Sequence, residues 1–201
     1  MRAVGCFQQR TYHLGQWVEK STGHRHLVTR ELARALRDAI EREFFYAPPQ
    51  SLIRLDCREL DVIDFTGADE LFVKMVRRLL MDEYGSVYLL LTGASNSQRH
   101  IIDVALTRAR LSLLVQQDDG AASVIGDLDP YLREAFAHVA EAGRLTARDL
   151  VEIEDISISD ASTILLRLYQ RRLIHRDAEV YKPSGGRYYV YTRIRENPHG
   201  A

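Results

Sequence analysis

The feature that most constrains the fold is a chain reversal near the C-terminal end. Between Lys182 and Arg187 the sequence places one proline, one serine and two glycines, which supply the fixed and positive φ angles that a turn needs. The flanking segments, 178–181 and 188–192, are rich in aromatic and β-branched residues, which strands prefer. The sequence therefore predicts a β-hairpin with a basic tip.

Three helical patterns precede this hairpin. The first, 131–142, is bounded by a proline before it and a glycine after it. Thr146 begins the second, with an acidic residue three positions later in a capping-box arrangement. Ser159 is the expected cap of the third, 160–172. Three helices followed by a hairpin resemble a winged helix-turn-helix domain, a fold that implies nucleic-acid binding.

The first half of the chain alternates helical and strand patterns. Apolar residues spaced three and four apart predict helices, while short apolar or alternating runs predict strands. We expect helices over 27–45 and 68–81, a helix from Asn96 or Ser97 to about Thr107, and strands over 51–57, 87–91 and 111–115. In the first helix the apolar positions include Ala35 and Ala39. Alternating strands and helices indicate an α/β layer around a sheet.

Residues 116–123 are polar and lack periodicity, which is typical of a connection between domains. We therefore expect an α/β domain over 1–116, a linker over 117–128, and a smaller, mainly α-helical domain with a β-hairpin wing over 129–201.

Residues 53–72 resemble the STAS domains, the fold of anti-sigma-factor antagonists and sulfate-transporter tails. In that family a strand ending in Asp is followed by an Asp–Ser/Thr–Ser/Thr–Gly motif that opens a helix. In this chain Asp56, Asp64, Thr66 and Gly67 fit the order. The first hydroxyl position of the motif holds a phenylalanine, so Thr66 supplies the remaining hydroxyl.

Two further stretches, 28–34 and 68–72, look more like a STAS-like family of unknown function. Members of that family are often encoded beside a histidine-kinase-type ATPase. The resemblance covers about residues 25–115 and implies a signal-receiving or partner-binding domain, with such an ATPase as the candidate partner.

Thr66 admits two interpretations. A hydroxyl at a helix N-terminus lies where free N–H groups favour an added negative charge, and phosphorylation there would change a docking surface by about two charges. With Asp64 and Asp69 it would form a phosphoacceptor and partner surface. The simpler interpretation makes Thr66 the N-cap of a helix from Gly67, with Asp64 as its capping partner.

The charge balance does not by itself indicate a DNA-binding protein. The net charge is −1, and residues 129–201 hold eleven basic and eleven acidic residues. From Ile156 onward, however, the sequence has eight basic residues and only four acidic ones, while acidic residues are concentrated in the second helical pattern. A basic edge with an acidic back suits an oriented approach to phosphates.

In a winged helix the third helix enters the major groove and the wing reaches a flanking backbone. The residues expected to contact DNA are Ser159, Ser162, Thr163, Arg167, Gln170, Arg171, Lys182 and Arg187. Hydroxyls serve base edges and phosphates alike, so no base preference is predicted. The alternative is a winged helix used for protein docking or dimerisation, which Asp160 at the helix start would favour. Arg171 can equally be a solvated residue at a helix C-terminus.

Other chemistries find little support. His24 and His26 alternate without a third metal ligand, and Cys6 and Cys57 are too few for a disulfide framework. Residues 93–97 join a strand to a helix but lack a P-loop lysine and dinucleotide glycine spacing, so a connecting loop is the simpler interpretation. We expect no enzyme activity, no metal and no cofactor.

No apolar run reaches the length of a membrane helix and the first ten residues lack a secretory apolar core, so we expect a cytoplasmic protein without membrane contact. The expected function is that of a homodimeric transcriptional regulator, with a STAS-like sensing domain and a DNA-binding winged helix. The alternative is a partner-switching protein that binds a kinase-type ATPase.

Overall fold

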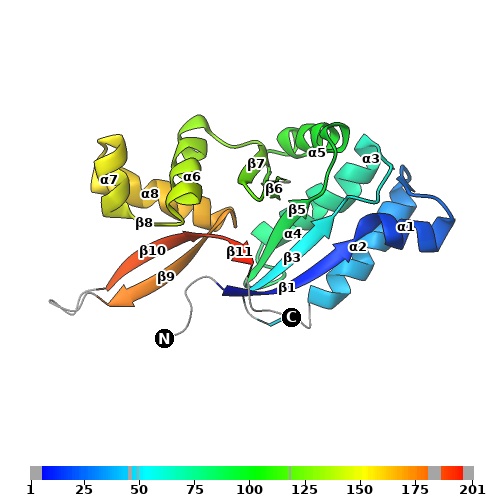
Figure 1. Cartoon of the computed structure of the whole chain (residues 1–201), viewed down its shortest axis with the longest axis horizontal. Coiled ribbons are helices and arrows are strands. Elements are labelled where there is room, and N and C mark those ends of the chain that lie inside the picture. Colours follow the sequence, from blue (N-terminus) through cyan, green and yellow to red (C-terminus); the bar gives the residue numbers. More distant parts are fainter. Residues whose placement is uncertain (1–5, 45–46, 49, 118, 181–186, 197–201) are drawn as a thin grey trace. The chain divides into compact units, whose positions relative to one another are not determined.

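The structure of the chain is a computed structural model. It describes residues 6–44, 47–48, 50–117, 119–180 and 187–196 (Figure 1). Among these residues, contacts define two compact units. The N-terminal unit comprises Gln8–Leu128, and the C-terminal unit joins residues 6–7 to residues 129–196. The chain is an α/β protein with a mixed sheet.

The N-terminal unit is built on a sheet with the strand order β1-β3-β5-β6-β7. Its strands are β1 (Cys6–His13), β3 (Ser51–Asp56), β5 (Val87–Thr92), β6 (Ser112–Gln116) and β7 (Ala122–Gly126). The first four are parallel, and β7 returns antiparallel to β6. Because parallel neighbours need crossover connections, a helix lies between each consecutive pair of the parallel strands.

These connections contain α1 (Leu14–Thr22), α2 (Arg30–Phe44), α3 (Phe65–Ala68), η1 (Asp69–Val73), α4 (Lys74–Leu80) and α5 (Asn96–Arg108). The segment η1 is π-helical, so α3, η1 and α4 form one continuous helix with a wider turn in its middle. Two short strands, β2 (His26–Leu27) and β4 (Val62–Ile63), pair in parallel before it.

The core of this unit lies between the helices and one face of the sheet. Alternate residues of the strands meet the apolar faces of the helices, so their burial removes apolar surface from water on both sides. The members include Ile53, Leu55, Leu89 and Leu91 from the strands, and Leu36, Ile40, Phe72, Met75 and Ile102 from the helices.

The predicted helices of this unit are present, with their caps at other residues. The helix predicted over 68–81 begins at Phe65, because the side chain of Asp64 accepts a hydrogen bond from the Gly67 backbone N at 2.7 Å. Asp64 is therefore the N-cap, and the prediction of Thr66 in that role is wrong. Thr66 is instead the second helical residue.

Two other details of the predicted helices differ. Ser95, rather than Asn96 or Ser97, caps α5 in a capping box. In α2 the side chains of Arg37 and Glu41 are buried, while Ala35 is exposed. The apolar pattern missed this because it assigns every charged residue to the solvent face.

The expected linker over 117–128 contains β7, which pairs with β6 from Ser112↔Gly126 to Gln116↔Ala122. The segment expected to be a linker therefore includes a strand of the N-terminal sheet. Val124 and Ile125 are buried and anchor this strand. This strand of five residues was not predicted because it follows a polar turn and is too short to show a clear period.

The C-terminal unit contains α6 (Pro130–Ala142), α7 (Ala147–Glu154) and α8 (Ile158–Gln170), with an antiparallel sheet of order β8-β10-β9. The strands are β8 (Arg144–Thr146), β9 (Ile174–Val180) and β10 (Arg187–Arg193). A short strand, β11 (Arg195–Glu196), pairs in parallel with residues 6–7. Buried residues of the helices and the sheet form a separate core: Leu132, Ala135, Phe136, Val139, Leu145, Leu150, Ala161, Leu165, Leu168, Ile174 and Val190.

Most local predictions for this unit are confirmed. Gly143 ends α6 in a left-handed conformation (φ 74°), and Thr146 with Asp149 forms the predicted capping box. The hairpin strands are present and longer than predicted, while its tip, 181–186, lies outside the described residues. Ser157, not Ser159, caps α8, because the Asp160 backbone N donates to its hydroxyl at 3.1 Å.

Among the described helices, none is both long enough and apolar enough to cross a membrane.

Candidate functional site

The outward face of α8 carries small polar side chains and one arginine. The inward face is apolar and buried, with Ala161, Ile164, Leu165 and Leu168. On the other face Ser159, Ser162, Thr163, Arg167 and Gln170 are all exposed. Their spacing of three, four and seven to eight residues places them on one side of a helix. Five of the eight predicted DNA-contacting residues therefore form one continuous exposed stripe.

Arg167 is held at the boundary between α8 and α6. Its guanidinium donates a hydrogen bond to the Tyr131 hydroxyl, and that hydroxyl donates to Asp129 Oδ2 at 3.3 Å. No carboxylate of the described residues forms an ion pair with Arg167. Its orientation is thus fixed by a neutral group, and its positive charge is not cancelled by a direct partner.

A second arginine is clamped between two aromatic rings beside this stripe. The guanidinium carbon of Arg176 on β9 lies 4.4 Å from the ring centroid of Tyr169 on α8 and 4.3 Å from that of Tyr189 on β10. Tyr189 is 51% exposed. The sequence reasoning missed this clamp. The clamp follows from the register of the hairpin. Tyr191 is directly opposite Arg176, so Tyr189 is its diagonal neighbour on the same face of the sheet.

Asp160 stands in the first turn of α8. The Ser157 hydroxyl donates to Asp160 Oδ2 at 2.7 Å while it accepts from the Asp160 backbone N. A carboxylate in this position also interacts favourably with the helix dipole. Capping and the dipole therefore explain Asp160 without a docking partner.

The remaining predicted DNA contacts lie elsewhere. Arg171 follows α8 as its C-cap and is half-buried. Arg187 is the first residue of β10, but its side chain lies outside the described part of the chain, as does the whole of Lys182. The structure therefore brings together the α8 stripe, and the hairpin tip stays a prediction.

The residues 64–67, on which the sequence resemblance to STAS domains rests, lie at the start of α3. Asp64, Thr66 and Asp69 are each half-buried, and Thr66 and Asp69 are three residues apart on the same side of the helix. A Cβ atom on Gly67 would lie 2.2 Å from the Leu27 carbonyl oxygen, so the close approach of α3 to β2 requires glycine here.

Three large apolar side chains near this motif are exposed. Val62 and Phe65 flank the capping residue in sequence, and Val28 follows the β2 residue that pairs with Ile63. The guanidinium of Arg108 lies 5.0 Å from the centroid of the Phe65 ring. A contiguous exposed apolar surface is typical of protein-interaction sites, and these three residues are the candidates for one here.

Metal and thiol chemistry find no site in the described part of the chain. No three His, Cys, Asp or Glu side chains there lie close enough together to hold a metal ion. His24 and His26 lie with their ring centroids 5.2 Å apart. Burial, together with the nearby Asp56 charge, raises the pKa of the Cys57 thiol well above its usual range, so the reactive thiolate is disfavoured.

No protein-family model matches this chain, and a comparison with curated proteins found no match either.

Proposed function

We propose that the C-terminal unit is a winged helix that binds double-stranded DNA through α8, and that the chain acts as a transcriptional regulator. The element order α6-β8-α7-α8-β9-β10 supports this proposal, since a winged helix inserts its third helix into the major groove. The observation that carries it is the exposed stripe of Ser159, Ser162, Thr163, Arg167 and Gln170.

The chemistry of this stripe suits a groove. Small hydroxyls allow the helix backbone to come close to the bases, and they donate to base edges or phosphates. The side-chain amide of Gln170 can donate a hydrogen bond to adenine N7 and accept one from adenine N6–H in the major groove. Arg167, which has no carboxylate partner among the described residues, supplies a charge for a phosphate or a guanine.

A homodimer would complete the binding site. One recognition helix contacts only a few base pairs, and two-fold pairing of protomers doubles that number. In this proposal the N-terminal unit is a STAS-like domain that receives the signal.

The test is fluorescence anisotropy of the intact chain with labelled duplex DNA over a series of salt concentrations. Arg167→Ala should weaken binding about tenfold and lower the salt slope by about one. The matched control is Arg42→Ala, because Arg42 is exposed on α2 in the other unit. Unchanged affinity and slope for Arg167→Ala would reject α8 as the DNA-contacting element.

The exposed apolar side chains around Thr66 favour a second candidate function, a partner-switching module that binds a kinase-type ATPase. Val28, Val62 and Phe65 would contact the partner, and the half-buried Thr66 would supply the switch.

Co-purification with such an ATPase should be lost on Thr66→Glu, which places a negative charge at the motif. It should be retained on Ser86→Glu, which adds the same negative charge at an exposed position before β5. Retention in both variants would remove Thr66 from this function.

A further inference from the structure

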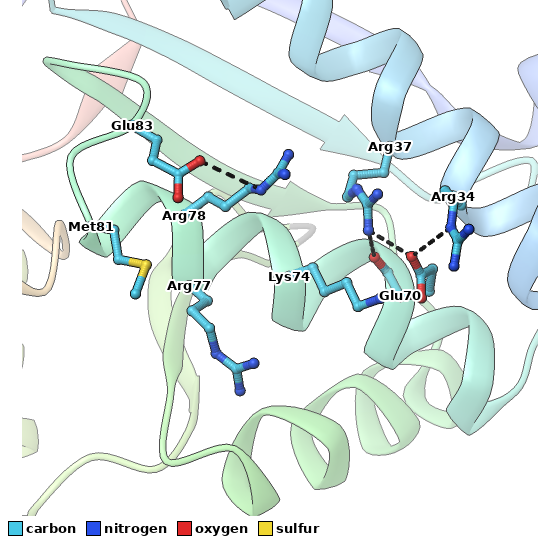
Figure 2. A pocket seen from close by; sticks show the side chains of 8 residues that line it. All are labelled: Arg34, Arg37, Glu70, Lys74, Arg77, Arg78, Met81 and Glu83. Atoms are coloured by element: carbon cyan, nitrogen blue, oxygen red, sulfur yellow. Dashed lines mark hydrogen bonds and ion pairs between the residues drawn. The ribbon is translucent and has the colours of Figure 1, made fainter.

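A cleft between α2 and the η1–α4 helix of the N-terminal unit is lined mainly by cations (Figure 2). Its volume is about 540 Å³, within the range of small-molecule sites. The lining residues are Arg34, Arg37, Glu70, Lys74, Arg77, Arg78, Met81 and Glu83. Five of these eight are cationic and two are acidic, so the lining carries a formal charge of +3.

The floor of the cleft is organised by Glu70, whose side chain is 0% exposed. Its carboxylate accepts hydrogen bonds from Arg37 at 2.6 Å and from Lys74 at 2.5 Å, and Arg34 Nε lies 3.5 Å away. Burial acts to raise the pKa of Glu70, but Lys74 and Arg37 outweigh it and hold that pKa below its usual value. Glu70 is therefore an anion that fixes three cations around it.

A second carboxylate lies beneath the other end. The Glu41 side chain is 8% exposed, and it accepts hydrogen bonds from Arg78 and from the Tyr84 hydroxyl. Arg37 Nε lies 3.5 Å from Glu41 Oε1. Both buried carboxylates thus pair with cations that line the cleft.

Several of the cations, by contrast, are exposed to solvent, although Arg37 is buried. The side chain of Arg34 is 57% exposed and that of Arg78 is 44% exposed. Arg77 is exposed too, and its side chain forms no hydrogen bond or ion pair with the described residues. In Figure 2 its guanidinium points away from Glu70 and from Glu83. Glu83 of the same lining is 46% exposed, so the solvent-facing groups include one carboxylate as well as the arginines.

The cleft has more cations than carboxylates even when nearby acidic residues outside its lining are included. Asp38 and Glu41 ion-pair with cations of the cleft without lining it. With them included, the five cations still outnumber the four carboxylates. Glu83 Oε2 is 3.5 Å from Arg78 Nε, so the other acidic residue of the lining is also paired with a cation.

We propose that this cleft binds a small ligand that carries two or more phosphate groups. Guanidinium forks donate paired hydrogen bonds to phosphate oxygens, and several cations together favour a multivalent anion over a monovalent one. Because Glu70 already holds Arg34 and Lys74, little side-chain freedom is lost on binding. A purely structural network would require Arg37, Lys74 and Arg78, but it gives no role to Arg77.

The test is isothermal titration calorimetry of the intact chain with pyrophosphate. We expect binding that weakens as salt is added. Arg77→Ala should raise the dissociation constant about fivefold or more without changing the melting temperature, because the Arg77 side chain has no partner within the described structure. Arg42→Ala, on the same helix as Arg34 but outside the cleft lining, should bind like the unaltered chain.

Two outcomes would overturn the proposal. The first is no binding of pyrophosphate at millimolar concentration, or equal affinity in the unaltered chain and in Arg77→Ala. The second is equal affinity for citrate at matched ionic strength, because the cleft would then respond to charge alone. These titrations contain no DNA, so their result is independent of the α8 assignment.

Discussion

Two regions of the molecule hold arginines at the surface in opposite ways. In the cleft several cations pair with Glu70 and Glu41, which are buried carboxylates, so the charges also tie α2 to the η1–α4 helix. On α8 the guanidinium of Arg167 is held by the neutral hydroxyl of Tyr131. The first arrangement makes stability depend on ionised groups, whereas the second leaves a charge for a polyanion at little cost in stability.

The largest expected effect comes from breaking the buried network. Glu70→Ala would leave Arg37 and Lys74 facing each other without the carboxylate, and we expect the free energy of unfolding to fall by about 3–5 kcal/mol. Urea-induced unfolding measures it. Arg167→Ala should lower the same quantity by less than about 1 kcal/mol, since an exposed side chain contributes little. Equal losses in the two variants would remove the distinction between the regions.

Acid should destabilise the chain through the same carboxylates. The pKa of Glu70 is lowered in the folded state, so the unfolded chain binds a proton more readily as the pH falls. Its stabilising contribution is complete above the ordinary value of about 4.3 and is lost as the pH falls through the lower folded pKa. Unfolding in urea at neutral pH and near pH 4 should show this slope.

Glu70→Gln should reduce that slope without abolishing it. Burial acts to raise the pKa of Asp56, but Arg58, with a smaller contribution from His13, outweighs burial, so the pKa is lowered overall. Asp56 therefore adds to the loss of stability as the pH falls, in the same direction as Glu70. An unchanged slope in the variant would mean that Glu70 is not the group that titrates.

The two candidate caps of α3 provide a smaller test. Asp64→Ala should cost about 1 kcal/mol of unfolding free energy, because the Gly67 N–H loses its acceptor. Thr66→Ala should cost only about a few tenths of that amount. Thermal or urea unfolding of both variants measures these losses. A larger loss for Thr66→Ala than for Asp64→Ala would identify Thr66 as the cap.

Breaking the aromatic clamp should have a small effect on stability. Tyr189→Ala removes one of the two rings around Arg176, and we expect a loss of about 0.5–1 kcal/mol. Tyr189→Phe is the matched control, since it keeps the ring and removes only the hydroxyl. If the two variants were equally destabilised, the stacking on Arg176 would not be the cause.

The sequence predicts well where a local pattern alone decides the structure. The continuous apolar run of β5, the capping box at Thr146 and the glycine after α6 each depend on neighbouring residues only. The β9–β10 hairpin belongs to the same group, because its turn residues and its aromatic strands are adjacent in the chain.

Caps and short strands were harder to place. Ser157 and Ser159 are both good capping residues, as are Asp64 and Thr66, and only the backbone register decides between them. The five residues of β7 are too few to show a clear period after a polar turn.

The buried charges could not be predicted from the apolar pattern. Arg37 and Glu70 are 33 residues apart, and their contact depends on the packing of α2 against η1. The available signals were the spacings of Arg37 to Glu41 and of Glu70 to Lys74, four residues each, which suggest ion pairs on a helix but not their burial. The clamp on Arg176 likewise requires the hairpin register.

The most direct test of the DNA-binding proposal is an NMR titration of the ¹⁵N-labelled intact chain with a short duplex DNA at low salt. We expect the largest amide shifts at Ser162, Thr163 and Arg167 on α8, and none at Arg42 on α2. Saturable DNA binding that leaves the α8 amides unmoved, or no binding at all, would contradict the proposal.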